Sequence, residues 1–182
     1  MPVFISLLRG INVMGNKVIL MADLKKVFEK LGFLEVKTYI QSGNVVFAEQ
    51  KKSAPELEDL IRFAIKTRFK FEVNVLVLGL DELEGIVQKN PFGKNKLKSG
   101  ERIYFTILSR VPSKEKSAEL LKIDGAGDDI KLIGKTVYVL CRKGYANSVF
   151  NNNFIEKILK VNATTRNLET SQKLVEIGKE IG

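Results

Sequence analysis

The sequence predicts an α+β protein built from two successive βαββαβ halves and a terminal helix. Three observations support this fold class. Apolar runs and amphipathic segments follow the order strand, helix, strand, strand, helix, strand over residues 1–79. The same order of elements returns from residue 102, although the residues themselves do not repeat. A further helical pattern occupies 168–181.

The first half begins with the apolar run 3–8, which has the length of a buried strand. Glycine and asparagine mark a loop over 9–17. A helix follows, because apolar side chains recur at i, i+3, i+4 and i+7, and because Gly32 can adopt the left-handed conformation that ends helices. The apolar stripe of this helix consists of Leu24, Val27, Phe28 and Leu31.

A hairpin, a second helix and a fourth strand complete the first half. The hairpin over 36–48 turns through residues 41–44, where glycine tolerates positive φ. Ser53 and Glu56 have the spacing of a capping box at the start of a helix. The apolar run 73–78 predicts the last strand of this half.

Residues 80–101 are predicted to form a link between the halves. An acidic first turn opens a short helix, which Asn90-Pro91 ends. Lysines among polar residues make 93–100 the segment expected to be most mobile. The predicted domains are therefore 1–79, the link, and 102–182 with the terminal helix.

The second half has matching elements. A strand over 103–108 precedes a helix capped by Ser113. A hairpin crosses Gly134-Lys135, and a helix is predicted over 147–159. A short strand over 162–165 comes last. This element order is that of the ferredoxin-like fold, so the sequence predicts two ferredoxin-like subdomains in tandem.

Composition indicates a globular protein of the cytoplasm. Of the 182 residues, 45% are hydrophobic and 28% are charged, which is enough apolar material for a core. No apolar run approaches the ~20 residues of a membrane-spanning helix, and no secretory leader is recognisable. One cysteine, Cys141, rules out an internal disulfide and suits a reducing compartment. Because Cys141 lies on an apolar strand, we expect a small core residue rather than a nucleophile.

The charge balance favours anionic partners. Thirty Lys and Arg against 21 Asp and Glu give a net charge of +9. Such an excess attracts nucleic acid, phosphorylated metabolites or acidic protein surfaces, although lysines spread along a chain also suit a merely solvated surface. Histidine is absent, and neither a metal-ligand spacing nor a glycine-rich nucleotide fingerprint occurs. Neither a metal nor a cofactor is therefore expected.

Polar residues gather in the first loop and the first hairpin turn. In a sheet of order 4-1-3-2 these segments meet at one border. Their amide, hydroxyl and cationic donors suit a carboxylate, a phosphate or a backbone carbonyl. Alternatively, the asparagines shape the turns and Arg9 ties the loop to the second half. We call these candidate ligand-binding residues the polar rim: Arg9, Asn12, Asn16, Lys17, Gln41, Ser42 and Asn44.

A second candidate cluster, Thr165, Arg166 and Asn167, precedes the terminal helix. Free N–H groups at a helix start attract anions, and Arg166 adds positive charge. The alternative is a plain N-cap by Thr165 or Asn167, with Arg166 paired to the other half. The asparagine run 151–153 is a poor helix former, and capping or contacts between the subdomains are its expected roles.

Three classes of function stay open: a ligand-binding module, a nucleic-acid-associated protein and an enzyme without histidine. RNA-recognition domains share the βαββαβ order and stack bases on aromatics of strands one and three. The third strand lacks their basic-glycine-aromatic spacing, and Phe4 and Phe47 suit a helix-covered core equally well. Association driven by charge alone remains. In a hydrolase or transferase, Ser42 near Lys17 could form a Ser–Lys pair, and other catalysis on a small anionic or amide substrate stays open.

Several motifs are recognisable as a set. They are Leu7-Leu8-Arg9-Gly10-Ile11-Asn12-Val13, Asn16-Lys17-Val18, Met21-Ala22-Asp23-Leu24, Leu31-Gly32-Phe33, residues 38–47, Asn90-Pro91-Phe92 and Ala163-Thr164-Thr165-Arg166-Asn167. Together they resemble the bacterial family known as domain of unknown function 1697. The resemblance implies two ferredoxin-like subdomains and implies no activity. Family members usually have Trp after the Arg-Asn pair, where this chain has Leu168.

Overall fold

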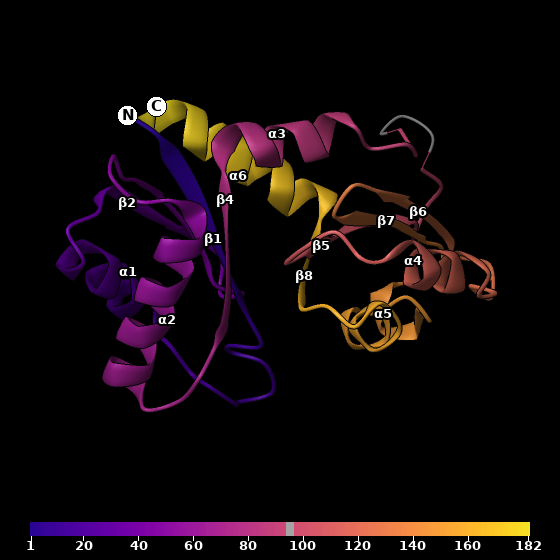
Figure 1. Ribbon diagram of the computed structural model, residues 1–182, viewed down its shortest axis with the longest axis horizontal. Helices are drawn as coiled ribbons and strands as arrows, with labels where there is room; N and C mark the ends of the chain where they lie inside the picture. Colours follow the sequence, from indigo (N-terminus) through magenta and orange to yellow (C-terminus); the bar gives the residue numbers. More distant parts are fainter. Residues whose placement is uncertain (94–96) are drawn as a thin grey trace. The chain divides into compact units, whose positions relative to one another are not determined.

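The structure, a computed structural model, describes residues 1–93 and 97–182. The loop expected to be mobile includes residues 94–96, which lie outside the described residues. The chain forms two compact units, Met1–Gly85 with Gln172–Gly182 and Ile86–Ser171, called here the first and second unit. Each contains one four-stranded sheet with helices packed on it (Figure 1).

The sheet of the first unit has the strand order β2-β3-β1-β4, with every neighbouring pair antiparallel. This is the order expected for a ferredoxin-like fold, because each helix crosses over between two strands of the sheet. The strands are β1 (Val3–Arg9), β2 (Leu34–Tyr39), β3 (Asn44–Ala48) and β4 (Asn74–Gly79).

Two helices, α1 (Met21–Lys30) and α2 (Ala54–Phe69), cover one face of this sheet (Figure 1). Phe47 lies at the centre of the core between these helices and the sheet. Its ring lies 4.5 Å from that of Phe33 and 5.4 Å from that of Phe28 on α1, measured between centroids. Phe4 of β1 joins the same cluster. The aromatics of strands one and three therefore point into the helix-covered core.

The predicted ends of these helices are confirmed. The backbone N–H of Ser53 donates to Glu56 Oε2 at 2.8 Å, which forms half of the capping box at the start of α2. Gly32, just after α1, has a φ of 86°, the left-handed conformation that a side chain disfavours.

Parts of two further helices complete the first unit. They are α3 (Leu80–Gln88) up to Gly85 and α6 (Leu168–Ile181) from Gln172 onward. A Cβ at Gly178 would lie 2.5 Å from Leu80 Cδ1, so a larger residue there would force the Leu80 side chain to move. An ion pair between Lys179 and Glu84 joins the same two helices.

The second unit repeats the architecture. Its sheet has the order β6-β7-β5-β8, again antiparallel throughout. The elements are β5 (Arg102–Leu108), α4 (Lys114–Leu121), β6 (Asp129–Ile133), β7 (Thr136–Cys141), a 3₁₀ turn (Tyr145–Asn147), α5 (Asn152–Leu159) and β8 (Ala163–Asn167). The predicted fold class, two tandem ferredoxin-like subdomains and a C-terminal helix, is confirmed.

The helix expected over 147–159 begins later, at Asn152. The side chain of Asn151 accepts a hydrogen bond from the Phe154 backbone N–H at 3.0 Å, which fixes Asn151 as the N-cap. Residues 145–147 form a separate 3₁₀ turn ahead of it. Asn151 thus serves as a cap, one of the roles predicted for the asparagine run.

Among the residues that the structure describes, no helix has both the length and the apolar character needed to cross a membrane.

Candidate functional site

The first loop and the first hairpin turn meet at one border of the first sheet. The side-chain amide of Asn12 donates to the Gln41 carbonyl at 2.9 Å, and the Leu8 N–H donates to the Gly43 carbonyl at 2.8 Å. The start of β4 reaches the same border, since Lys17 Nζ donates to the Glu72 carbonyl at 2.7 Å. The polar rim therefore brings together two segments that are distant in sequence, and the chain just before β4 contacts it through Lys17.

Asn12 organises the first loop. Its Oδ1 accepts from the Ile19 N–H at 2.8 Å, and its Nδ2 donates to the Ile19 carbonyl and the Gln41 carbonyl, both at 2.9 Å. One amide thus offers an acceptor and both donors to the backbone. Asn12 is a scaffold residue of the rim, which is the turn-shaping alternative expected for the asparagines.

Asn44 has a similar internal role in the hairpin turn. Its side chain is fully buried and donates to the Tyr39 carbonyl at 2.9 Å and to Ser42 Oγ at 3.0 Å. Gly43 completes the turn at a φ of 83°, and a Cβ there would lie 2.7 Å from Ile11 Cδ1. The turn is thus packed directly against the first loop.

Unfavourable backbone conformations gather at this border. Of the eight described residues other than glycine with positive φ, four lie here: Asn12 (55°), Met14 (49°), Lys17 (47°) and Ile40 (49°). β-Branched Ile40 is the least tolerant of this conformation. Strained backbone of this kind is concentrated at ligand clamps and switches.

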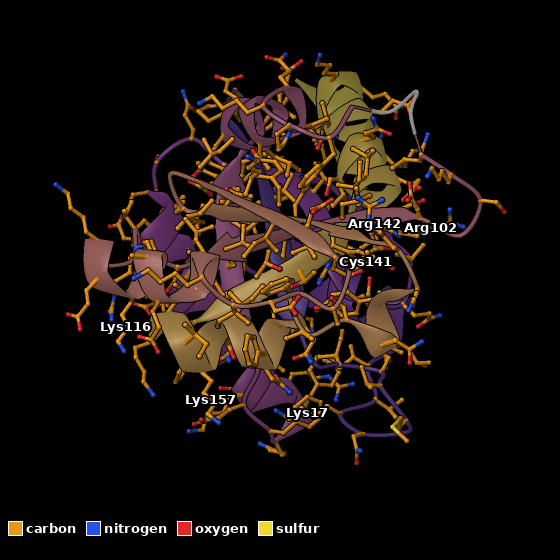
Figure 2. All side chains as sticks on the ribbon, turned by 90° about the vertical axis from the view of Figure 1, so that its right-hand side faces the viewer. Lys17, Arg102, Lys116, Cys141, Arg142 and Lys157 are labelled. Carbon is orange, nitrogen blue, oxygen red and sulfur yellow. The ribbon has the colours of Figure 1, made fainter. Side chains whose placement is uncertain are left out.

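Three polar side chains of the rim are exposed: Asn16, Lys17 and Gln41. Figure 2 shows Lys17 at the surface of the first loop. Arg9 is half-buried at the end of β1, where its position in the sheet is opposite Asn74 of β4. The rim thus has an inner layer that fixes the backbone and an outer layer of amide and cationic donors.

The hydrogen bonds described for Lys17 and Ser42 lead to partners other than each other. The Lys17 ammonium is directed to the Glu72 carbonyl, and the Ser42 hydroxyl accepts from the Asn44 amide. A serine nucleophile needs its base within hydrogen-bond reach. These contacts give no support to Ser42 and Lys17 as catalytic residues.

The second candidate cluster lies in the second unit, at the end of β8. Thr165 Oγ1 donates to Asn152 Oδ1 at 2.8 Å and lies 2.8 Å from Thr106 Oγ1. Asn167 Oδ1 accepts from the Thr170 N–H at 2.8 Å, so Asn167 caps α6. Both side chains serve internal hydrogen bonds.

Arg166, between them, is buried in the structure. Its Nη1 donates to the Thr165 carbonyl at 2.9 Å. Burial lowers the pKa of Arg166 to about 10, so the guanidinium remains charged at neutral pH. The structure describes this cluster and the polar rim in separate units.

A charged cluster around Arg142 was not identified from the sequence. Arg142 follows β7 (Figure 2), and its guanidinium contacts Glu101 Oε1 at 2.6 Å, Asp129 Oδ2 at 2.5 Å and the Gly127 carbonyl at 2.7 Å. The Lys98 N–H and the Arg142 guanidinium hold the pKa of Glu101 below its ordinary value. No spacing in the sequence marks these partners, because the pairing of β7 with both β5 and β6 brings them together.

One prediction about a reactive group can be compared with the structure. Cys141 is fully buried, and burial raises the pKa of its thiol to about 11, so it is a core residue. Within the described ranges, no group of three or more Cys, Asp or Glu side chains is arranged to hold a metal ion.

A search of curated proteins finds no match. Among solved structures, the fold is similar to that of a conserved bacterial protein, SP0830 from Streptococcus pneumoniae, with a TM-score of 0.77 and 18% sequence identity. The similarity covers 97% of this chain and 98% of that chain, and it shows the fold alone. A family model matches residues 1–138. This chain therefore belongs to the family described as "Protein of unknown function (DUF1697)".

Proposed function

We propose that this protein is a non-catalytic module that binds a small anionic ligand at the polar rim of the first unit. One observation carries the proposal: three strained residues, Met14, Lys17 and Ile40, surround a border that the Asn12 amide holds from within. Each such conformation costs about 1–3 kcal/mol and persists only where its surroundings over-determine it. If the turn had no further role, glycine at these positions would remove the backbone strain, because glycine adopts positive φ at no steric cost.

The outer layer of the rim has the donors that an anion requires. Gln41 and Asn16 are exposed amides, each with an NH₂ group. Lys17 donates one hydrogen bond to the Glu72 carbonyl and, as an ammonium with three donors, can also bind an anion. Arg9 adds a planar guanidinium suited to two-point contact with a carboxylate or phosphate. The net charge of +9 favours the approach of such ligands.

A thermal-shift screen tests this proposal. Wild-type protein and the variants Arg9→Ala and Gln41→Ala would be screened against phosphorylated metabolites, dicarboxylates and mononucleotides at two salt concentrations. Arg102→Ala and Gln88→Ala are matched controls at exposed positions in other elements. Tight ligands should raise the melting temperature of wild type and both controls, and the rim variants should lose that increase.

The unliganded melting temperatures decide between a site and a structural clasp. The binding proposal predicts that both rim variants melt like the controls without ligand. A lower melting temperature in both rim variants, with no ligand effect in wild type, would show that the polar cluster only holds the fold together.

Charge-driven association with nucleic acid is the second candidate, and the net charge of +9 favours it. Stacking on sheet aromatics does not support it, because Phe4 and Phe47 point into the helix-covered core. Affinity for a short RNA that falls steeply with salt and is unchanged in Gln41→Ala would favour this candidate over the rim.

A further inference from the structure

The outer surface of the first unit has an apolar groove between α1 and α2. Its volume is about 650 Å³, within the range of cavities that bind ligands or side chains. The lining residues on each helix recur at i, i+3, i+4 and i+7, so one stripe from each helix faces the groove. The apolar part of the lining is Val27, Leu31, Leu60, Phe63 and Ala64.

Phe63 distinguishes this groove from an ordinary helix surface. Its side chain is 70% exposed, although it lies in the groove lining with Leu60 and Ala64 on the same stripe of α2. A large aromatic ring left in water beside other apolar groups is typical of an interaction surface.

Basic side chains surround the apolar part of the groove. Lys26, Lys30, Arg68 and Lys70 line it, against one acid, Asp23. Asp23 lies 3.7 Å from Lys26. Within the described part of the chain, no carboxylate lies at salt-bridge distance from Lys30, Arg68 or Lys70.

We propose that this groove binds an amphipathic helix of a partner protein. Phe63 would contact the apolar stripe of the partner helix, and the cations that line the groove would face Glu or Asp side chains beside that stripe. An apolar groove between two helices is a surface in which the apolar face of an amphipathic helix can pack. Charge complementarity selects an acidic partner. The inference is independent of the polar rim, since no residue is shared.

A second copy of this chain fits the groove poorly. A symmetric contact would place the same four cations of each copy against those of the other. Like charges brought together at an interface suppress association.

The test uses ¹⁵N-labelled full-length protein and two synthetic peptides of about 15 residues. A covalent bridge between side chains keeps each peptide helical, because isolated helices of this length are marginal in water. Both carry leucines at i, i+3, i+4 and i+7, one with glutamates and the other with lysines at the flanking positions. The acidic peptide should shift the amide signals of α1 and α2 and bind at least about tenfold more tightly than the basic peptide.

Variants then test separately the apolar lining and the cations of the groove. Phe63→Ser should weaken the acidic peptide by about tenfold or more, whereas Val111→Ser, at a 67% exposed position of the second unit, should leave binding unchanged. The double variant Lys30→Glu with Arg68→Glu should reverse the preference, so that the basic peptide binds more tightly.

Several results would overturn this proposal. They are an absence of localised shifts at about 1 mM acidic peptide, equal affinity for the two peptides, and tighter binding of dodecanoate at the same amides, which would assign the groove to small amphiphiles. Self-association measured by light scattering and abolished in Phe63→Ser would assign it to a second copy instead.

Discussion

Asn12 is the residue on which the border between the first loop and the hairpin turn depends most directly. Its side chain satisfies two backbone groups of Ile19 and the carbonyl of Gln41. Its φ of 55° is a conformation that asparagine tolerates better than most residues. Alanine would lose the hydrogen bonds and fit the backbone less well.

Asn12→Ala should therefore lower the free energy of unfolding by about 1–3 kcal/mol, because it leaves partly buried backbone groups without their partner. Urea denaturation measures the change. Asn16→Ala, at the exposed tip of the same loop, is the control and should change stability by less than about 0.5 kcal/mol. Equal effects of the two substitutions would show that the Asn12 contacts carry no stability.

Glu101 and Arg142 give a pH-dependent prediction at the same scale. The pKa of Glu101 is depressed below its ordinary value of 4.5 in the folded protein, chiefly by the Lys98 N–H and then by Arg142. A depressed carboxyl pKa stabilises the fold above the unfolded pKa, and that stability is lost as the pH falls through the folded value.

Glu101→Gln should accordingly lower the melting temperature at pH 7, and the difference from wild type should shrink as the pH falls below about 4.5. Glu115→Gln, at an exposed position of α4, serves as the control. A difference for Glu101→Gln that stayed constant from pH 7 to well below the ordinary glutamate range would rule out the charged contact as its cause.

At the scale of elements, helix starts show how far local sequence could predict the structure. Ser53 with Glu56 marked the start of α2, because both partners of a capping box are local in sequence. The start of α5 was predicted five residues too early, at 147 rather than Asn152. Several polar residues there can cap a helix, and packing of Phe150 into the core selects Asn151.

Asn151→Ala should cost about 0.5–2 kcal/mol, because the Phe154 N–H loses its acceptor. Thermal and urea unfolding would measure this loss. Asn162→Ala, an exposed asparagine outside any helix, should be close to neutral. A neutral Asn151→Ala would mean that another group caps α5.

At the scale of the whole molecule, the tandem fold follows from element order, and the topology alone predicts that the first loop meets the hairpin turn. The sequence could not predict which residues of the polar rim hold the backbone and which present exposed donors. Whether Asn12 and Asn44 face backbone carbonyls or a ligand depends on atom positions at the turn, which no spacing encodes. The sharing of α6 by both units likewise depends on tertiary packing. Leu168 is buried at the start of that helix.

The most direct test of the central claim is an amide NMR titration of ¹⁵N-labelled protein with inorganic phosphate and with succinate at constant ionic strength. The rim proposal predicts saturable shifts of Asn16, Lys17 and Gln41 for at least one of the two anions, and their loss in Gln41→Ala. Weak, unsaturated shifts spread over the lysine-bearing helices of both units, unchanged in Gln41→Ala, would contradict it.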